Sequence, residues 1–334
     1  MASSDKTLPA VEESAPAAAA SAAGRRARLA GLLLLAVAAI VPPLALSGYG
    51  LDLLSEVWVF AIAAISLDLL MGYGGLVSFG HAAFFGVGAY GAVILSARFG
   101  IDPWFCLLGG VVLATLAAGL IGAFCVRMGG ASFFMLTLAF AQLLYSGAVK
   151  WRPLTGGSDG MGGLARPDVL GFDAADSRVM YLLSLAALTL VFLAAQRLIG
   201  SQFGRALIGV RENELRMRAL GYRTRRLKLL AFIIAGGFAG LAGGLYACFD
   251  GFVSPDVLSF EMSGSLLLMV VLGGTGTLFG PVIGAAVYLL AKNFVSSHTE
   301  HWLLIVGVIF VACVMGLPNG LYGLLRRGIT ADGP

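Results

Sequence analysis

Four polar residues lie within or beside long apolar runs, where an ionisable or hydrogen-bonding side chain could carry chemistry. They are Asp68, Ser78, His81 and Gln142. A charged or polar group in such surroundings pairs with another polar group or lines a polar route. We therefore expect these four residues to form part of a pathway or gate, with His81 or Arg127 as the partner of the Asp68 carboxylate. A structural role in helix packing is the alternative for each of them.

A second group of residues is the basic segment over 198–228, which is rich in arginine and also contains glutamates. Four of its apolar residues are spaced to share one face of a helix: Ile208, Leu215, Ala219 and Tyr222. Gly221 suits the end of that helix. A short amphipathic helix in a basic loop is typical of a segment that docks into a groove of a soluble partner. A helix lying on anionic lipid is the alternative, which the same basic residues favour.

The sequence contains no pattern typical of an enzyme. It has no GxxxxGK[ST] phosphate loop and no HExxH or GxSxG motif, and its four cysteines show no CxxC spacing. His298 and His301 have HxxH spacing but no further ligands beside them, so a metal site is not expected. We expect no catalytic residue, no cofactor and no metal. Any ATP hydrolysis that drives this protein would have to come from another chain.

The composition indicates a membrane protein with spanning helices. Of 334 residues, 59% are apolar and 12% are charged, and the mean hydropathy is +0.91. An ordinary soluble domain has about 25% charged residues, so this chain has too little polar surface for a soluble globule and is too apolar for extended disorder. Its apolar runs are continuous, whereas barrel strands alternate. The net charge of +4 follows membrane topology and does not indicate nucleic acid binding.

We expect an all-α polytopic membrane protein with about ten transmembrane helices, because each span needs about 20 apolar residues. The expected spans are 29–47, 53–71, 79–97, 104–125, 131–149, 179–197, 229–249, 262–278, 280–297 and 302–318. Glycine is frequent, at 47 residues, and the glycine-rich span 79–97 is expected to be broken or re-entrant. The first span is expected to stay uncleaved, although Ala45-Leu46-Ser47 loosely resembles a signal-peptide cleavage site.

The charge distribution predicts orientation and domain organisation. With the N-terminus in the cytoplasm, 16 of the 22 Lys and Arg residues fall in cytoplasmic segments, which is the positive-inside pattern. We therefore expect a disordered cytoplasmic tail over 1–28, a transmembrane domain over 29–318 and a cytoplasmic tail over 319–334. The two large soluble segments are an outer loop over 150–178 and a cytoplasmic loop over 198–228.

Four stretches of the chain, taken together, resemble a known family. They are the basic loop from Arg205 to Gly221 with its continuation to Gly244, the glycine-rich segment from Gly72 to Tyr90, the segment from Leu154 to Gly160, and 251–255 followed by 271–277. In this order they resemble the high-affinity branched-chain amino-acid permeases of bacterial ABC importers, and the LivM-like subunit in particular. Leu215-Arg216-Met217 depart from the general importer consensus, which has Glu-Ala-Ala there.

The resemblance implies a transport permease and not an enzyme. It implies the transmembrane subunit of a bacterial ABC importer for branched-chain or related amino acids, which forms the translocation pathway by alternating access. The implied partners are a second permease subunit in a heterodimer, two ATP-binding subunits, a periplasmic substrate-binding protein and the lipid of the bacterial inner membrane. The exact substrate stays open among branched-chain amino acids, other amino acids, urea and organic acids.

The same resemblance makes the basic loop a coupling loop that docks on the ATPase subunits. Its expected coupling residues are Arg205, Arg211, Glu212, Glu214, Leu215, Arg218, Ala219 and Gly221. Leu215 and Ala219 are expected in the contact itself. The two glutamates are expected to meet basic groups of the partner, and Arg211 and Arg218 acidic ones.

The outer loop over 150–178 is expected to face the binding protein or the outer gate. Its glycines indicate flexible or tight turns, and a plain connector is the alternative.

An ion-coupled secondary transporter of small polar solutes is the alternative function for the whole chain. Broken helices and an intramembrane carboxylate such as Asp68 would permit it. Such a transporter would not need a basic docking loop.

Overall fold

A computed structural model describes residues 38, 40–164, 167, 176–298, 304–305, 307–308, 311 and 320–323. The chain divides into a short unit that ends at Ser47 and a larger unit from Gly48 onward. In the short unit, residues 40–45 are helical. The tail predicted over 1–28, most of the tail predicted over 319–334, and parts of the predicted spans 29–47 and 302–318 lie outside the described residues.

Seven helices in the described part of the chain are long and apolar enough to cross a membrane. They are α2 (Gly48–Asp68), which continues into the π-helical turn η1 (Leu69–Tyr73), α3 (His81–Phe99), α4 (Pro103–Cys125), α5 (Ala131–Lys150), α7 (Ser177–Gly200), α10 (Thr224–Asp250) and α12 (Phe279–Ser296). A shorter apolar helix, α11 (Phe260–Gly273), follows α10. These eight helices coincide with eight of the ten predicted spans, and the total of ten stays a prediction.

The remaining elements are short. The α8–α9 end of the helices carries α8 (Gln202–Glu212) and α9 (Glu214–Ala219), and the opposite, β1–β2 end carries α6 (Arg152–Thr155), η2 (Gly157–Asp159), β1 (Met161–Gly162) and β2 (Phe252–Val253). η3 (Pro255–Leu258) follows β2 and packs against α3 and α5. β1 and β2 pair antiparallel, with Met161 opposite Val253. The helical class is therefore correct for the described residues apart from this strand pair.

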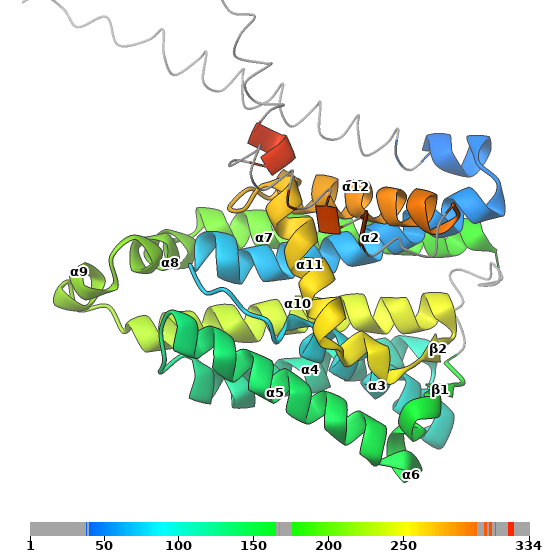
Figure 1. Cartoon of the computed structure of the whole chain (residues 1–334), viewed down its shortest axis with the longest axis horizontal. Helices are drawn as coiled ribbons and strands as arrows, with labels where there is room; N and C mark the ends of the chain where they lie inside the picture. The colour runs from blue at the N-terminus through cyan, green and yellow to red at the C-terminus, as the bar shows by residue number, and fades with distance from the viewer. Residues whose placement is uncertain are drawn as a thin grey trace, which may run out of the picture. The chain divides into compact units, whose positions relative to one another are not determined.

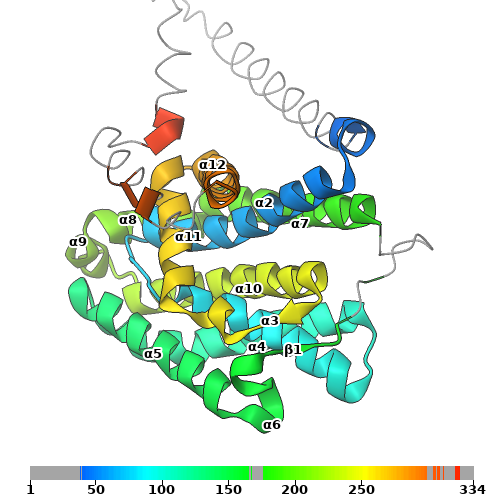
Figure 2. The same ribbon diagram turned by 45° about the vertical axis from the view of Figure 1, so that its right-hand side comes forward.

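The helices of the larger unit pack in two layers with α2 in the middle (Figures 1 and 2). α2 is buried along most of its length and packs against α7, α12 and α10, while α10 packs against α3 and α4 on its other side. α5 lies at the edge, with few buried residues. Large apolar side chains on α4 and α5 are exposed, including Leu116, Leu120, Met135 and Leu143. Such surfaces are stable in contact with lipid tails.

Glycines explain the close packing of α3, α4 and α10. A Cβ atom added to Gly88 would collide with the backbone of Gly240, and one added to Gly110 would collide with the carbonyl oxygen of Gly88. The three helix backbones therefore touch where side chains would otherwise separate them. This contact accounts for part of the high glycine content.

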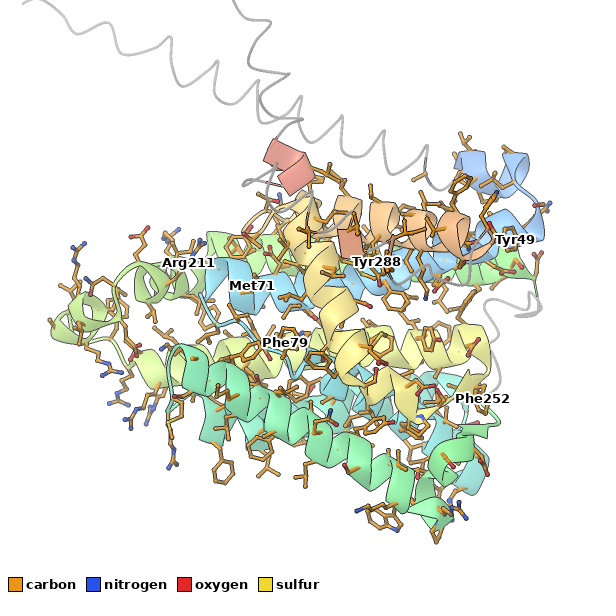
Figure 3. The ribbon with its side chains drawn as sticks, viewed as in Figure 1. Tyr49, Met71, Phe79, Arg211, Phe252 and Tyr288 are labelled. Atoms are coloured by element: carbon orange, nitrogen blue, oxygen red, sulfur yellow. The ribbon has the colours of Figure 1, made fainter. Side chains whose placement is uncertain are left out.

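Two helices begin part of the way along the bundle. Residues 74–80 are not helical, and α3 starts only at His81. Figure 3 shows Phe79 between Met71 and Phe252 along the length of the bundle. α11 has 14 residues, which is about 21 Å of helix and less than the roughly 30 Å hydrocarbon core. The span 79–97 was predicted to be broken or re-entrant. α3 is instead continuous from His81 to Phe99, and the non-helical residues 74–80 precede it, so no break lies within this helix.

Candidate functional site

The basic segment over 198–228 folds into two helices and not into the single predicted helix. α8 ends at Glu212, and Asn213 has extended backbone angles (φ −156°, ψ 97°). The side chain of Asn213 accepts a hydrogen bond from Arg216 N–H at 2.9 Å and so caps α9. The predicted shared face of Ile208, Leu215, Ala219 and Tyr222 is therefore wrong, because the break at position 213 rotates α9 relative to α8.

α8 and α9 differ in what they bury. α8 buries Leu207 and Val210 against the bundle, whereas no residue of α9 is buried. The exposed fractions are 76% for Leu215 and 67% for Leu220, so none of the described residues covers these apolar side chains at the tip of the segment. Figure 1 shows α9 at the extreme of the α8–α9 end, beyond α2, α7 and α10.

Gly221 ends α9 as the sequence predicts. Its φ of 87° lies in the left-handed region, which favours glycine. Its N–H donates to Arg218 O, and the N–H of Tyr222 donates to Met217 O, both at 3.0 Å. This is the Schellman arrangement at a helix C-terminus. Ala219, the last residue of α9, is exposed.

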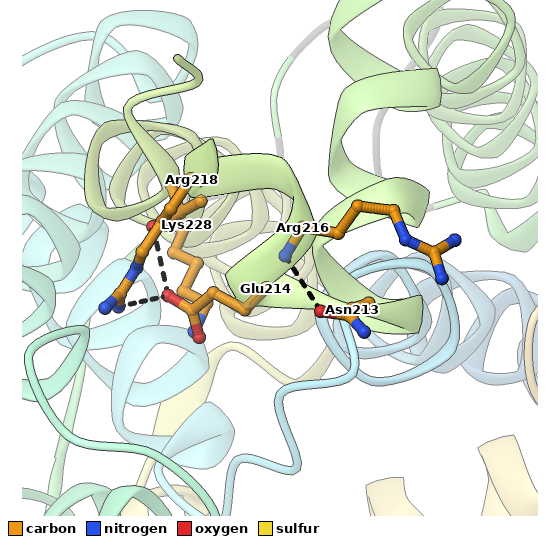
Figure 4. Close-up of polar contacts among 6 residues, drawn as sticks. Asn213, Glu214, Arg216, Arg218 and Lys228 are labelled. Carbon is orange, nitrogen blue, oxygen red and sulfur yellow. Dashed lines mark hydrogen bonds and ion pairs between the residues drawn. The ribbon is translucent and has the colours of Figure 1, made fainter. Parts of the chain in front are cut away.

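Glu214 is held by three donors within the chain (Figure 4). Its carboxylate lies 2.6 Å from Lys228 Nζ, 2.7 Å from Arg218 Nη2 and 3.0 Å from the Thr224 hydroxyl oxygen, which donates to it. Partial burial alone would raise the pKa of Glu214, but these donors outweigh it and lower the pKa to about 2. Glu214 and Arg218 were predicted to face partner groups of opposite charge. In this structure they bind each other and fasten α9 to α10.

The other predicted coupling residues have separate surroundings. Arg205 Nη1 donates to Gly200 O at 2.9 Å and closes the turn between α7 and α8. Glu212 is exposed at the end of α8. Arg211 turns toward the bundle, where its guanidinium donates to the carbonyl oxygen of Gly72, and Figure 3 shows it beside Met71.

Arg211 and Asp68 meet at a polar cluster that we call the junction, formed by Asp68, Gly72, Arg211 and Gly276. Asp68 is 1% exposed, and its Oδ1 accepts a hydrogen bond from Gly276 N–H at 2.8 Å. The positive charge of Arg211 acts on the same carboxylate. The structure thus places Gly276 and Arg211 at Asp68, in place of the predicted partners His81 and Arg127.

The junction is tightly packed. A Cβ atom at Gly72 would collide with the Asp68 carboxylate and with the backbone of Gly276. A Cβ atom at Gly75 would lie 2.9 Å from Cγ of Arg211, and Gly75 has a φ of +67°. Glycine is therefore required at these positions for η1, the following turn and the 274–278 turn to come together around the carboxylate.

Ser78 and His81 lie at the start of α3, away from the junction. Ser78 Oγ accepts a hydrogen bond from Gly80 N–H at 3.3 Å, and His81 Nε2 lies 2.7 Å from Ser66 Oγ. The Ser66 hydroxyl oxygen also lies 2.6 Å from Ala63 O, and His81 Nδ1 has no hydrogen-bond partner among the described residues.

Three aromatic rings beside the start of α3 were not predicted as site residues. Phe79 stacks on Phe260 with ring centroids 5.1 Å apart and meets the edge of Phe134 at 4.7 Å. The rings come from the 74–80 segment, from the first residue of α11 and from α5. Gln142, the fourth predicted pathway residue, lies on the exposed face of α5.

The described ranges contain no group of three His, Cys, Asp or Glu side chains close enough to hold a metal ion. His298 Nδ1 lies 2.8 Å from Phe294 O and from Ser297 Oγ. His301 lies outside the described residues.

The described structure has long apolar helices, two of which begin inside the bundle, and a compact polar segment at one end. These features define a multi-pass membrane protein of the permease class. Residues 49–314 match the family described as branched-chain amino acid transport system / permease component, and the chain belongs to this family.

Its relatives include two proteins named high-affinity branched-chain amino acid transport system permease protein LivM. The one from Escherichia coli K12 is 29% identical over 318 residues, and the one from Salmonella typhimurium LT2 is 30% identical over 320 residues. Each alignment covers 88% of this chain and 75% of the relative. LivH of Escherichia coli K12 is 25% identical over 284 residues, covering 79% of this chain and 91% of the relative. No solved structure gives a significant match to the chain.

Proposed function

We propose that this protein is the permease subunit of a bacterial ABC importer for branched-chain or related amino acids. The names of its LivM and LivH relatives support the substrate class. The subunit would form one half of a translocation pathway and pair with a second, different permease subunit. Two ATP-binding subunits would drive alternating access, and a periplasmic binding protein would deliver the substrate.

The observation that carries this proposal is the exposed tip of the α8–α9 segment. Leu215 and Leu220 are largely exposed on α9, and arginines surround them, as at Arg216 and Arg223. An apolar centre with a charged rim is typical of a docking surface. Because α9 is tied to α10 by Glu214 and Lys228, and α8 reaches the junction through Arg211, a partner bound at this tip would act on the membrane helices.

The starts of α3 and α11 inside the bundle support a pathway near its middle. Transporters commonly bind substrate where discontinuous helices begin, because the helix ends supply free backbone groups there. Ser78 and His81 lie at the start of α3, and Phe79 with Phe260 could contact an apolar side chain of the substrate. Gln142 on exposed α5 would face the second permease subunit across the pathway.

The orientation follows from the same assignment. The α8–α9 end would lie in the cytoplasm of the bacterial cell and the β1–β2 end outside the inner membrane, where the segment over 150–178 would face the binding protein. Both termini would then be cytoplasmic, with tails at 1–28 and 319–334 on either side of the transmembrane domain at 29–318.

The decisive experiment purifies the permease with its co-expressed second permease and ATPase subunits and compares two variants. Leu215→Asp would place an unpaired charge in the docking surface, which is unfavourable when no partner neutralises it. Gln196→Asp adds the same charge at the exposed end of α7 and serves as the control. We expect Leu215→Asp to lose the ATPase subunits and amino acid uptake, while Gln196→Asp keeps both.

Two other outcomes would overturn the proposal. If Leu215→Asp keeps the ATPases but binds anionic vesicles more weakly, the segment lies on lipid. If the permease alone accumulates substrate in vesicles in response to an ion gradient, the protein is a secondary transporter.

A further inference from the structure

The junction connects three parts of the chain that would have to move relative to one another during transport. Asp68 and Gly72 lie at the end of α2 and in η1, Arg211 lies on α8, and Gly276 lies in the turn between α11 and α12. Arg211 is therefore one point where the proposed coupling loop reaches the membrane helices, beside the buried Leu207 and Val210 of α8. Its predicted role was to meet an acidic group of a partner, yet its guanidinium binds inside this chain.

Arg211 binds a carbonyl group that a helix end leaves available. The last carbonyl groups of a helix lack partners within it, and Gly72 lies in the final residues of η1. A cation at such a position is favoured by the helix dipole. Arginine has five N–H donors in a planar fork, and the contact with Gly72 uses the Nη1 group alone. The guanidinium can therefore bind a second acceptor without leaving the cluster.

The Asp68 carboxylate offers that second acceptor. Oδ1 binds Gly276 N–H, whereas Oδ2 is buried and has no hydrogen-bond partner among the described residues. A buried carboxylate oxygen without a donor is unfavourable. The positive charge of Arg211 already acts on this carboxylate, so a small displacement of α8 toward η1 would improve the electrostatic contact between them.

We propose that Arg211 is a positioning residue that exchanges its guanidinium between the Gly72 carbonyl and Asp68 Oδ2 as α8 moves. This inference rests on the proposed function, because the movement of α8 is supplied by bound ATPase subunits. In the described arrangement, Arg211 holds the end of η1 while Asp68 holds the 274–278 turn. In the second arrangement, the guanidinium and Gly276 share the carboxylate, and the end of η1 is released from α8.

The packing of the junction makes such an exchange discrete. Gly72 and Gly276 bring their backbones into contact, so that no side chain stands between the carboxylate and the turn. Tightly packed contacts shift between distinct arrangements and do not deform continuously. Movement of α8 by the length of one hydrogen bond would therefore change which helix ends are held together. This change would link binding of the ATPase subunits to opening of the translocation pathway at its cytoplasmic end.

The first test replaces Arg211 in the full complex with both ATPase subunits. Arg211→Gln removes the charge, Arg211→Lys keeps it with a single donor group, and Arg197→Gln removes a charge from the exposed last turn of α7 as the control. The readouts are ATPase co-purification and the number of substrate molecules transported per ATP hydrolysed. We expect Arg211→Gln to retain the ATPases but to transport about tenfold less per ATP, with Arg211→Lys intermediate and Arg197→Gln unchanged within about twofold.

The second test uses Asp68→Asn, which keeps one acceptor oxygen for Gly276 N–H but replaces the other with an NH₂ group that cannot accept from arginine. We expect Asp68→Asn to lower transport per ATP as Arg211→Gln does, and the double variant to be no worse than either single variant, because both changes remove the same contact. Independent, multiplicative losses would overturn the exchange. If Asp68→Asn does not accumulate in membranes, the test rests on the transport per ATP of Arg211→Gln, Arg211→Lys and the wild type.

The outcomes separate this inference from the proposed function. If the wild-type permease retains its ATPases and Arg211→Gln behaves like Arg197→Gln, the junction inference fails and the importer assignment stands. Loss of the ATPases from Arg211→Gln would also overturn the inference, since Arg211 would then be a docking residue. If the wild-type permease binds no ATPase, the importer assignment itself fails.

Discussion

The ammonium nitrogen of Lys228 lies 2.6 Å from a carboxylate oxygen of Glu214, although the Lys228 side chain is only 8% exposed. Lys228 lies in the first turns of α10, and Glu214 is the first residue of α9. The pair therefore fastens the exposed tip of the α8–α9 segment to a helix that runs through the bundle. Arg218 and Thr224 bind the same carboxylate, so that Glu214 is the centre of this attachment.

The attachment of α9 should depend on pH in a defined direction. The pKa of Glu214 is lowered from 4.5 to about 2, so its carboxylate stabilises the folded segment fully above pH 4.5. Protonation removes this contribution as the pH falls from about 4.5 to about 2. We expect a spin label at Leu220→Cys to be immobile at pH 5–8 and to become mobile across that acidic window. With Glu214→Gln in addition, the label should be mobile at every pH, and an unchanged acidic transition in that variant would contradict the assignment.

Removing one partner of the Glu214–Lys228 pair should be worse than removing both. Glu214→Gln leaves the buried Lys228 ammonium without its carboxylate, which costs about 1–3 kcal/mol. Lys228→Met removes the charge and keeps an apolar side chain of similar length. We expect the double variant to be more stable than Glu214→Gln alone in thermal unfolding of the detergent-solubilised protein. Equal destabilisation by Glu214→Gln with and without Lys228→Met would show that the pair is not coupled.

Local signals in the sequence predict much of the fold. The long apolar runs place eight helices, and Gly221 marks the end of α9. Asparagine is a residue type preferred at helix N-termini, so Asn213 also indicates the break between α8 and α9. The prediction missed this break because it followed the helical spacing of the apolar residues across position 213.

Contacts between distant parts of the chain could not be predicted in the same way. Asp68 is recognisable as a buried carboxylate, but its partner Gly276 lies 208 residues away and binds through a backbone N–H that any residue type carries. The β1–β2 pair involves two residues from each strand, which is too short for an alternating pattern. Arg211 was predicted to meet an acidic group of a partner, because the sequence does not show that the turn after η1 passes beside it.

Close contact between α3 and α10 should make Gly88 intolerant of a side chain. A Cβ atom there would collide with the Gly240 backbone, and overpacking in such a place costs about 1–3 kcal/mol. We expect Gly88→Ala to lower the thermal stability of the purified protein. Gly147→Ala on α5 is the matched control, because no atom lies within 4 Å of its added Cβ. The control should be neutral or stabilising by up to about 1 kcal/mol, and equal losses for both variants would contradict the close contact.

The orientation of the protein can be tested with single cysteines placed where the structure tolerates them. Gly160 is a poor position, because its φ is +70° and a Cβ atom would collide with Val253 O, and Asn213 caps α9. Ser158 and Leu220 are exposed at opposite ends of the helices and avoid both problems. In a variant whose four native cysteines are replaced, we expect Ser158→Cys to react with a membrane-impermeant maleimide in cells with a permeabilised outer membrane. Leu220→Cys should react only after the inner membrane is opened, because the arginine-rich α8–α9 end would lie in the cytoplasm. If Leu220→Cys reacts first and Ser158→Cys reacts only after the inner membrane is opened, the α8–α9 end lies outside, where cytoplasmic ATPase subunits cannot reach it.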